Sequence, residues 1–369
     1  MPYAFAPAFS RGLGVPLAAM TLLIALNQAT SLLGPLSGPL GDRWGYRTMM
    51  LGGLGLLSTG MFVVGVLPVY TAAVVAVTLA GVAKILFDPA IQAYAGACVP
   101  YQKRGLAIGL IETAWAGSTL LGIPLAGILI ERAGWQSPFV ALGILALISG
   151  GLIAWLVPST PRRCQDGRWW ATYPHAWRSL RQRPATWALL GFTLLTCAAN
   201  DCIFVVYASW LETGFGLTVV ALGGATVVIG LAELVAEGLV AAASDRIGLS
   251  RAAIVGTTLA VVSYAILPFA STTLPLALSG LFLIFLCFEF SVVSAMSVFT
   301  EVMPSARGTM MSLNLSAAGA GRTLGALLGG LVWPMGGLWA SSISAAAICA
   351  IALGCLAWGL QRWHASKRA

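Results

Sequence analysis

The chain has 369 residues, of which 59% are hydrophobic and only 9% are charged. Soluble domains carry about 25% charged residues, so this composition excludes an ordinary soluble protein and predicts an integral membrane protein. The formal net charge of +8 does not indicate a nucleic-acid partner, because the basic residues gather in connections between apolar stretches.

Eleven apolar stretches follow one another along the chain, each near the roughly 20 residues that span a bilayer. Backbone polar groups cannot stay unpaired in lipid, and the alternating pattern of a membrane β-strand does not occur. The predicted fold class is therefore an all-α membrane protein. The expected spans are 17–40, 48–67, 70–98, 106–130, 137–157, 186–211, 217–243, 252–269, 273–300, 309–333 and 338–360.

Basic residues occur mainly in alternate connections, which sets the expected orientation. One side holds Arg47, the Arg-rich segment 158–185 and Arg362, and by the positive-inside rule this side is cytoplasmic. We expect a multi-pass protein of a bacterial inner membrane with a cytoplasmic C-terminus. The segment 158–185 is a predicted linker between an N-terminal bundle at 1–157 and a C-terminal bundle at 186–369.

The first predicted span ends in a tight charged segment, GPLSGPLGDRWGYRTMM, at 34–50. Its glycines permit a tight turn and close helix packing, and its aspartate can accept hydrogen bonds at a helix N-terminus. Its arginines can reach carboxylates or carbonyls of the other half. The segment is a candidate conformational gate, with a simple turn as the alternative. The expected gate residues are Gly38, Asp42, Arg43, Gly45 and Arg47.

Ionisable residues inside a span are expensive to bury in lipid, so each is a functional candidate. Lys84 and Asp88 are four residues apart on one helix face and are expected to pair, which could also be purely structural. Glu112 and Trp115 lie one turn apart. They are candidates for the wall of a central cavity, with a structural role as the alternative.

In the second half, Asn200 and Asp201 lie near the middle of the span 186–211. Asp201 has no cation near it in sequence, so it is the first candidate for proton exchange, and Glu289 is the second. Arg322 is expected to meet one of these acids or an anionic substrate, with a structural ion pair as the alternative.

Glu233 and Glu237 lie one turn apart on one face, where like charges disfavour ionisation of both. Glu237 is nearer the cytoplasmic end of its span. The alternative for Glu237 is a contact with the loop at Asp245 and Arg246.

An internal repeat relates the two halves. GDRWGYR at 41–47 matches SDRIGLSR at 244–251, and Asp42 corresponds to Asp245 at an offset of 203 residues. Arg104 with Arg307 keeps the same offset, and so do three glycine pairs. The chain is therefore predicted to contain two similar halves in the same orientation. Asp245 and Arg246 are the gate candidates of the second half.

The same offset sets residues 1–10 against the end of the span 186–211. The rest of that span has no counterpart in the first half. We therefore expect most of an initial helix to be missing. A misplaced start codon is the preferred explanation, and a naturally shortened protein is the alternative.

The pattern Gly38-x-Leu40-Gly41-Asp42-Arg43-x-Gly45-x-Arg47 resembles the signature loop of the major facilitator superfamily, which joins the second and third helices. The resemblance covers the whole chain and implies two six-helix bundles, with 12 helices expected and about 11 present. It also implies that the loop acts as a gating hinge. Tyr46 stands where a basic residue is commoner, so one contact of the gate is expected to be absent.

The segment AGSTLLGIPLAG at 116–127 resembles the antiporter signature of the family's fifth helix, with one residue inserted before Pro124. This resemblance implies export. The alternative is a glycine-lined helix contact with a proline bend.

The expected function is secondary active transport of a small molecule by alternating access, coupled to protons and directed to export of an amphipathic compound. Metabolite uptake and a non-transporting receptor or scaffold are the alternatives. An enzyme, a cofactor and a metal site are not expected, because His175 and His364 are isolated and no CxxC pair occurs. The expected partners are the substrate, protons and the lipid bilayer, and the protein is expected to be a monomer.

Overall fold

The computed structural model describes residues 9–10, 12–15, 23, 26–27, 30–158, 184–217, 219–304 and 306–368. Within these ranges the regular secondary structure is helical and no strand occurs. The predicted linker lies almost entirely outside the described residues, and so does most of the predicted first span. The expectation of a shortened first helix falls there too and stays a prediction.

The chain forms two compact units that do not follow a single cut in the sequence. Unit 1 comprises Met1–Ala97, Ser118–Ala176 and Ser305–Ser316, and unit 2 comprises Cys98–Gly117, Trp177–Pro304 and Ala317–Ala369. Each unit thus includes a segment from the other half of the sequence. Under the repeat offset, Ser305–Ser316 of unit 1 corresponds to a stretch within Cys98–Gly117 of unit 2. The predicted bundle boundaries at 157 and 186 stay a prediction.

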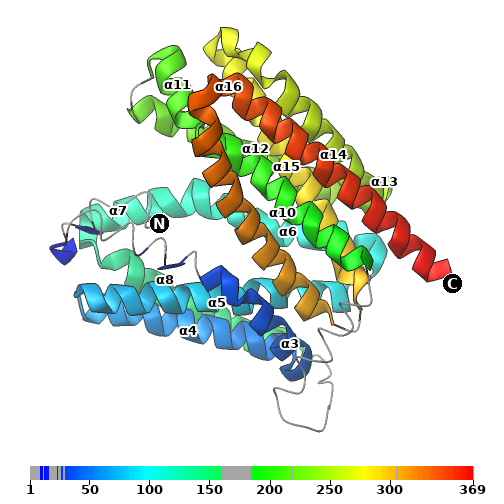
Figure 1. The fold of residues 1–369 in the computed structure, drawn as a ribbon. Coiled ribbons are helices and arrows are strands. Elements are labelled where there is room, and N and C mark those ends of the chain that lie inside the picture. Colours follow the sequence, from blue (N-terminus) through cyan, green and yellow to red (C-terminus); the bar gives the residue numbers. More distant parts are fainter. Residues whose placement is uncertain are drawn as a thin grey trace. The chain divides into compact units, whose positions relative to one another are not determined.

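Unit 1 is built around two long apolar helices, α4 and α8, which pack along each other (Figure 1). Ser58 of α4 donates a hydrogen bond to the carbonyl of Gly143 on α8 at 3.0 Å, so a buried hydroxyl is satisfied at this contact. The helices lying wholly in unit 1 are η1 (Thr30–Leu33), α3 (Gly34–Trp44), α4 (Tyr46–Val66), η3 (Ser118–Gly122), α7 (Ile123–Ala133) and α8 (Ser137–Leu156). The helix α5 (Tyr70–Cys98) belongs to unit 1 except for its last residue.

Unit 2 is centred on α15, which packs against α14, α12, α10 and α6. Its buried core is apolar and includes Tyr264, Leu281 and Phe285. The helices of unit 2 are η2 (Tyr101–Lys103), α6 (Arg104–Gly117), α10 (Pro184–Phe204), α11 (Tyr207–Phe215), α12 (Val219–Leu239), η5 (Val240–Ser244), α13 (Asp245–Ile247), α14 (Leu249–Ile266), η6 (Leu267–Thr272) and α15 (Leu274–Val302).

Eight of the described helices are long and apolar enough to cross a membrane, or nine when the bent pair Tyr101–Gly122 and Pro124–Ala133 counts as one span. The last of them, α16 (Arg307–Arg368), joins two predicted spans (Figure 1, orange to red). A straight helix of 62 residues would be about 93 Å long, three times the hydrocarbon thickness. The backbone leaves helical geometry at Gly336 and Gly337, where two spans meet.

Two glycines fix how closely α16 approaches α10. A Cβ on Gly321 would lie 2.1 Å from the carbonyl oxygen of Leu194, and one on Gly325 would lie 2.3 Å from that of Ala198. Only glycine fits at either position, because the added atom would overlap the backbone of α10. This close contact brings Arg322, which lies between the two glycines, next to the middle of α10.

Candidate functional site

The carboxylate of Asp42, at the end of α3, closes the N-terminus of α16. It accepts hydrogen bonds from the backbone N–H groups of Gly308 and Thr309 at 2.8 and 2.9 Å, and from the Thr309 hydroxyl at 2.7 Å. The first N–H groups of a helix have no partner within the helix, and a carboxylate also interacts favourably with the positive end of the helix dipole. All these residues belong to unit 1.

Tyr46 completes this first cap. Its hydroxyl donates a hydrogen bond to Asp42 at 2.8 Å, so the tyrosine adds a contact at the position where one was expected to be absent. Gly45 has φ 90°, a left-handed conformation that favours glycine, and it lets α3 and α4 meet without a longer loop. Arg47 donates to the backbone carbonyl of Ala154 in its own half. The expected reach of Arg47 to the other half stays a prediction.

A second cap repeats the first one in unit 2. Asp245 accepts hydrogen bonds from the backbone N–H groups of Gly105 and Leu106 at 2.9 and 3.0 Å, at the start of α6. These three residues correspond under the repeat offset to Asp42, Gly308 and Thr309. Gly248 has φ 94° and repeats the conformation of Gly45. The duplication predicted from the sequence therefore extends to individual hydrogen bonds.

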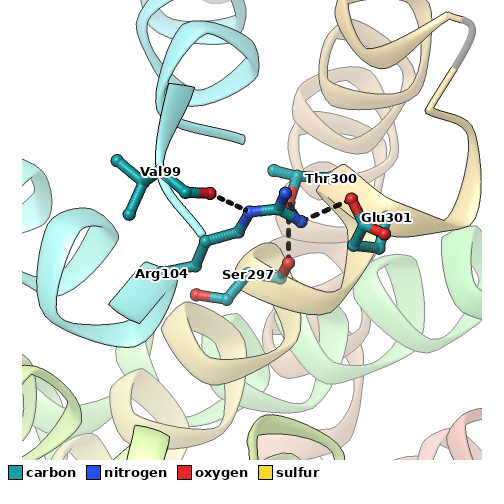
Figure 2. Close-up of polar contacts among 5 residues, drawn as sticks. All are labelled: Val99, Arg104, Ser297, Thr300 and Glu301. Carbon is teal, nitrogen blue, oxygen red and sulfur yellow. Dashed lines mark hydrogen bonds and ion pairs between the residues drawn. The ribbon is translucent and has the colours of Figure 1, made fainter. Parts of the chain in front are cut away.

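Beside the second cap, Arg104 makes a buried ion pair, which Figure 2 shows. Its guanidinium lies 2.6 Å from a carboxylate oxygen of Glu301, and its Nε donates to the carbonyl of Val99 at 3.0 Å. The Thr300 hydroxyl accepts a third, longer hydrogen bond at 3.3 Å. A buried ion pair is stable only when further hydrogen bonds satisfy its polar atoms, as they do here.

The charged pair in unit 1 is confirmed as a pair. Lys84 and Asp88 lie 3.2 Å apart on α5, with their side chains 43% and 35% exposed. The pair is therefore half-exposed and internally neutral. Its functional role stays a prediction.

In unit 2, acidic side chains gather around Arg322 of α16. The guanidinium interacts electrostatically with Asp201 of α10, Glu289 of α15 and Glu233 of α12. These interactions agree with the expectation that Arg322 meets one of the acids, and an ion pair between Arg322 and any one of them stays a prediction. This region therefore holds more acidic than basic side chains, one cation against three carboxyl groups.

Glu237 lies on α12, one turn beyond Glu233, and its interactions are with other acids. Its electrostatic partners are Glu289, Glu112 and Glu233. Neither of its carboxylate oxygens has a hydrogen-bond partner among the described residues. The expected alternative, a contact from Glu237 to the loop at Asp245 and Arg246, is therefore wrong.

Four further candidates lie near these groups or on the surface. Asn200 is buried, and its side-chain oxygen accepts a hydrogen bond from Tyr264 at 3.2 Å, which ties α10 to α14. Trp115 is 46% exposed on α6, one turn after Glu112. Arg246 is exposed beside the second cap, and Arg43 is half-buried beside the first.

The sequence profile of the Major Facilitator Superfamily matches residues 1–200, more than half of the chain. The chain belongs to this superfamily. The similarity also extends beyond the matched residues. YceJ, an uncharacterized MFS-type transporter of Bacillus subtilis, is 29% identical over 307 residues, which cover 82% of this chain and 77% of that protein.

Two other similar proteins cover different shares of the chain. The tetracenomycin C resistance and export protein of Streptomyces glaucescens is 30% identical over 120 residues, 32% of this chain and 22% of that one. A solved bacterial homologue of the iron transporter ferroportin, in an outward-facing state, has a TM-score of 0.78 at 13% identity, over 97% of this chain and 94% of that chain. The predicted all-α fold of the superfamily is confirmed, and the chain is an integral, multi-pass membrane transporter.

The residues that complete the two caps were not predicted from the sequence of this superfamily member. Gly308 belongs to one of the three glycine pairs of the repeat, and Thr309 and Glu301 belong to no motif. Each lies far along the chain from its partner: Thr309 is 267 residues from Asp42. The repeat itself was the available signal. Each loop contains an aspartate, and each half contains a helix start at the same offset, so the repeat could have predicted that each aspartate caps the helix start from the other half of the sequence.

Proposed function

We propose that this transporter moves a small amphipathic molecule by alternating access and that proton movement through Asp201 and Glu289 drives it. The observation that supports this proposal is the shared interaction of both carboxyl groups with Arg322, inside helices that cross the membrane. Ionisable groups at such depth are costly, which favours a functional role for them.

Competition between protons and Arg322 provides the coupling. When Asp201 is ionised, it attracts the guanidinium of Arg322. A proton on Asp201 cancels that attraction and leaves Arg322 to its other acidic partners. A substrate that favours one of these two arrangements is thereby linked to the proton, because each ligand shifts the same equilibrium.

The two aspartate caps serve as the gate in this proposal. Asp42 holds the start of α16 and Asp245 holds the start of α6. These helix starts are the segments that each half of the sequence contributes to the other unit. Opening on the cytoplasmic side requires the capping hydrogen bonds to break, and closing restores them.

Export is the proposed direction, in a bacterial inner membrane with the C-terminus in the cytoplasm and with a monomer as the working unit. Support comes from the antiporter-like segment 116–127 and from the similarity to a resistance and export protein over part of the chain. Uptake of a metabolite would appear in the same flux assay as transport in the opposite direction.

The test is flux in proteoliposomes that contain the full chain, under an imposed pH gradient, with a panel of amphipathic dyes. Asp201→Asn keeps the size of the side chain but cannot exchange a proton, so we expect it to abolish proton-linked transport. Glu212→Gln, on the exposed end of α11, is the control and keeps normal flux. An unchanged pH dependence in Asp201→Asn refutes the coupling role. Absence of flux for every compound, with or without the gradient, favours a receptor or scaffold instead.

A further inference from the structure

Unit 2 gathers four glutamates from three helices: Glu112 on α6, Glu233 and Glu237 on α12, and Glu289 on α15. We propose that these four carboxyl groups, the glutamate cluster, bind an organic cation in exchange for protons. The proposal rests on the proposed transport function and names the substrate class of that transporter.

Helix packing brings the four side chains together. The helix α12 packs against both α6 and α15, and α15 also packs against α6. Where α6 passes the end of α12, a Cβ on Gly109 would lie 3.0 Å from the carbonyl oxygen of Glu237. Glu112 follows Gly109 by three residues and therefore lies on the same face of α6. Glu237 consequently interacts electrostatically with Glu289, Glu112 and Glu233.

Glu237 is the member of the cluster that indicates a ligand. Its side chain is 0% exposed, and both carboxylate oxygens lack a hydrogen-bond partner in the part of the chain that the structure describes. The groups that act on it electrostatically are three more carboxyls. A buried carboxylate without a donor or a cation is strongly unfavourable, so Glu237 must carry a proton or face a bound cation.

Arg322 neutralises only part of the cluster. Its guanidinium interacts with Glu233 and Glu289, and also with Asp201. Glu112 on α6 and Glu237 on α12 add two more carboxyl groups to the cluster. A positively charged ligand complements such a site, whereas an anion of the same size is repelled by it.

The arrangement fits an organic cation better than a metal ion. Among the described residues, no group of three or more His, Cys, Asp and Glu side chains is placed to hold a metal ion. Trp115 follows Glu112 by one turn on the same helix face. An indole ring beside carboxylates binds large, weakly hydrated cations through its π face. The expected ligand therefore has an apolar body and a delocalised positive charge.

The exchange balances in charge and in protons. When the cation binds, the O–H bond of a protonated carboxyl breaks, the electron pair stays on oxygen, and the proton leaves to water. One cation then replaces one proton, and the net charge of the site is unchanged. Over the range in which one proton is displaced, affinity for the cation rises about tenfold per pH unit.

The test uses the full chain purified in detergent, with tetraphenylphosphonium as the probe. Calorimetry in buffers of different ionisation enthalpy gives the affinity and the number of protons released. We expect about one proton per bound cation. Glu237→Gln is expected to weaken binding about tenfold or more at pH 8 and to reduce proton release, while Glu212→Gln, outside the cluster, behaves as the unmodified protein. Tetraphenylborate, an anion of the same shape, is expected not to bind.

Several results would overturn the proposal: binding without proton release, equal binding of tetraphenylborate, or unchanged affinity in both Glu237→Gln and Glu289→Gln. If Glu237→Gln does not fold, the proposal is still tested by the number of protons that the unmodified protein releases per bound cation and by the affinity of Glu289→Gln for tetraphenylphosphonium. Proton-linked flux of a neutral or anionic compound, with no binding of tetraphenylphosphonium, contradicts this inference alone. Absence of proton-linked flux for any compound contradicts the proposed function itself.

Discussion

The two aspartate caps share one backbone design but differ in what strengthens them. At the start of α16, Asp42 accepts two backbone hydrogen bonds and two more from the hydroxyls of Thr309 and Tyr46. At the start of α6, Asp245 accepts the two backbone bonds, and the neighbouring Arg104 pairs with Glu301. Both halves contain the cap, but hydroxyl groups stabilise the first cap, whereas an ion pair lies beside the second.

The repeat offset explains why each support occurs only once. Thr309 corresponds to Leu106, which has no hydroxyl group, and Glu301 corresponds to Cys98, which has no carboxylate. At the corresponding positions, each cap therefore lacks the side chain that supports the other. Equal backbone geometry with unequal side chains implies that the two caps open at different free-energy costs, which the following substitutions measure.

Loss of the ion pair is expected to have the largest effect. Arg104→Met removes the cation that lies 2.6 Å from the carboxylate of Glu301, which is 19% exposed, and such a change costs about 3–5 kcal/mol. Thermal unfolding in detergent measures the loss. Adding Glu301→Leu is expected to recover most of it, because the unpaired charge disappears. A double variant that is no more stable than Arg104→Met would show that the ion pair is not the support of this cap.

Removal of each capping carboxylate is expected to have an intermediate and unequal effect. Asp42→Ala loses four hydrogen bonds and should cost about 2 kcal/mol, whereas Asp245→Ala loses two and should cost about 1 kcal/mol. The same unfolding assay compares them side by side. Equal losses would mean that the hydroxyl groups around Asp42 add nothing to its cap.

The hydroxyl groups themselves are expected to give the smallest effects. Tyr46→Phe and Thr309→Val each remove one hydrogen bond from Asp42 and should cost about 0.5–1.5 kcal/mol. The reciprocal change, Leu106→Thr, supplies a hydroxyl at the second cap and should stabilise it by a similar or smaller amount. Destabilisation by Leu106→Thr would contradict the equivalence of the two positions.

Much of this site was predictable because its chemistry is local or repeated. The charged segment at 34–50 and its copy at 244–251 indicated an aspartate suited to a helix N-terminus in each half, though not which helix it caps. The spacing of Lys84 and Asp88 predicted their pairing, which lies at 3.2 Å. These features depend on residues one turn apart or on a constant offset. Neither requires knowledge of which helices are neighbours.

The rest depends on helix packing, which the spacing of apolar residues does not specify. Arg104 and Glu301 belong to different helices, α6 and α15, and nothing in either local sequence indicates the other. Glu237 likewise has a different environment from the one expected, because α6 and α15 bring Glu112 and Glu289 beside it. The partners of Arg322 were predicted as a class, since a cation within a membrane span needs an acid, but only the fold selects them.

The break in α16 has a mechanical consequence. Gly336 and Gly337 turn the chain without a charged loop, next to Met335, which is 82% exposed, and Trp339, which is 50% exposed. Such an apolar corner belongs at the bilayer boundary rather than in water. Because only these two residues separate the two spans, a change in the tilt of one span changes the position of the other. A movement of the capped start of α16 is thereby transmitted through Gly336 and Gly337 to the span that follows them.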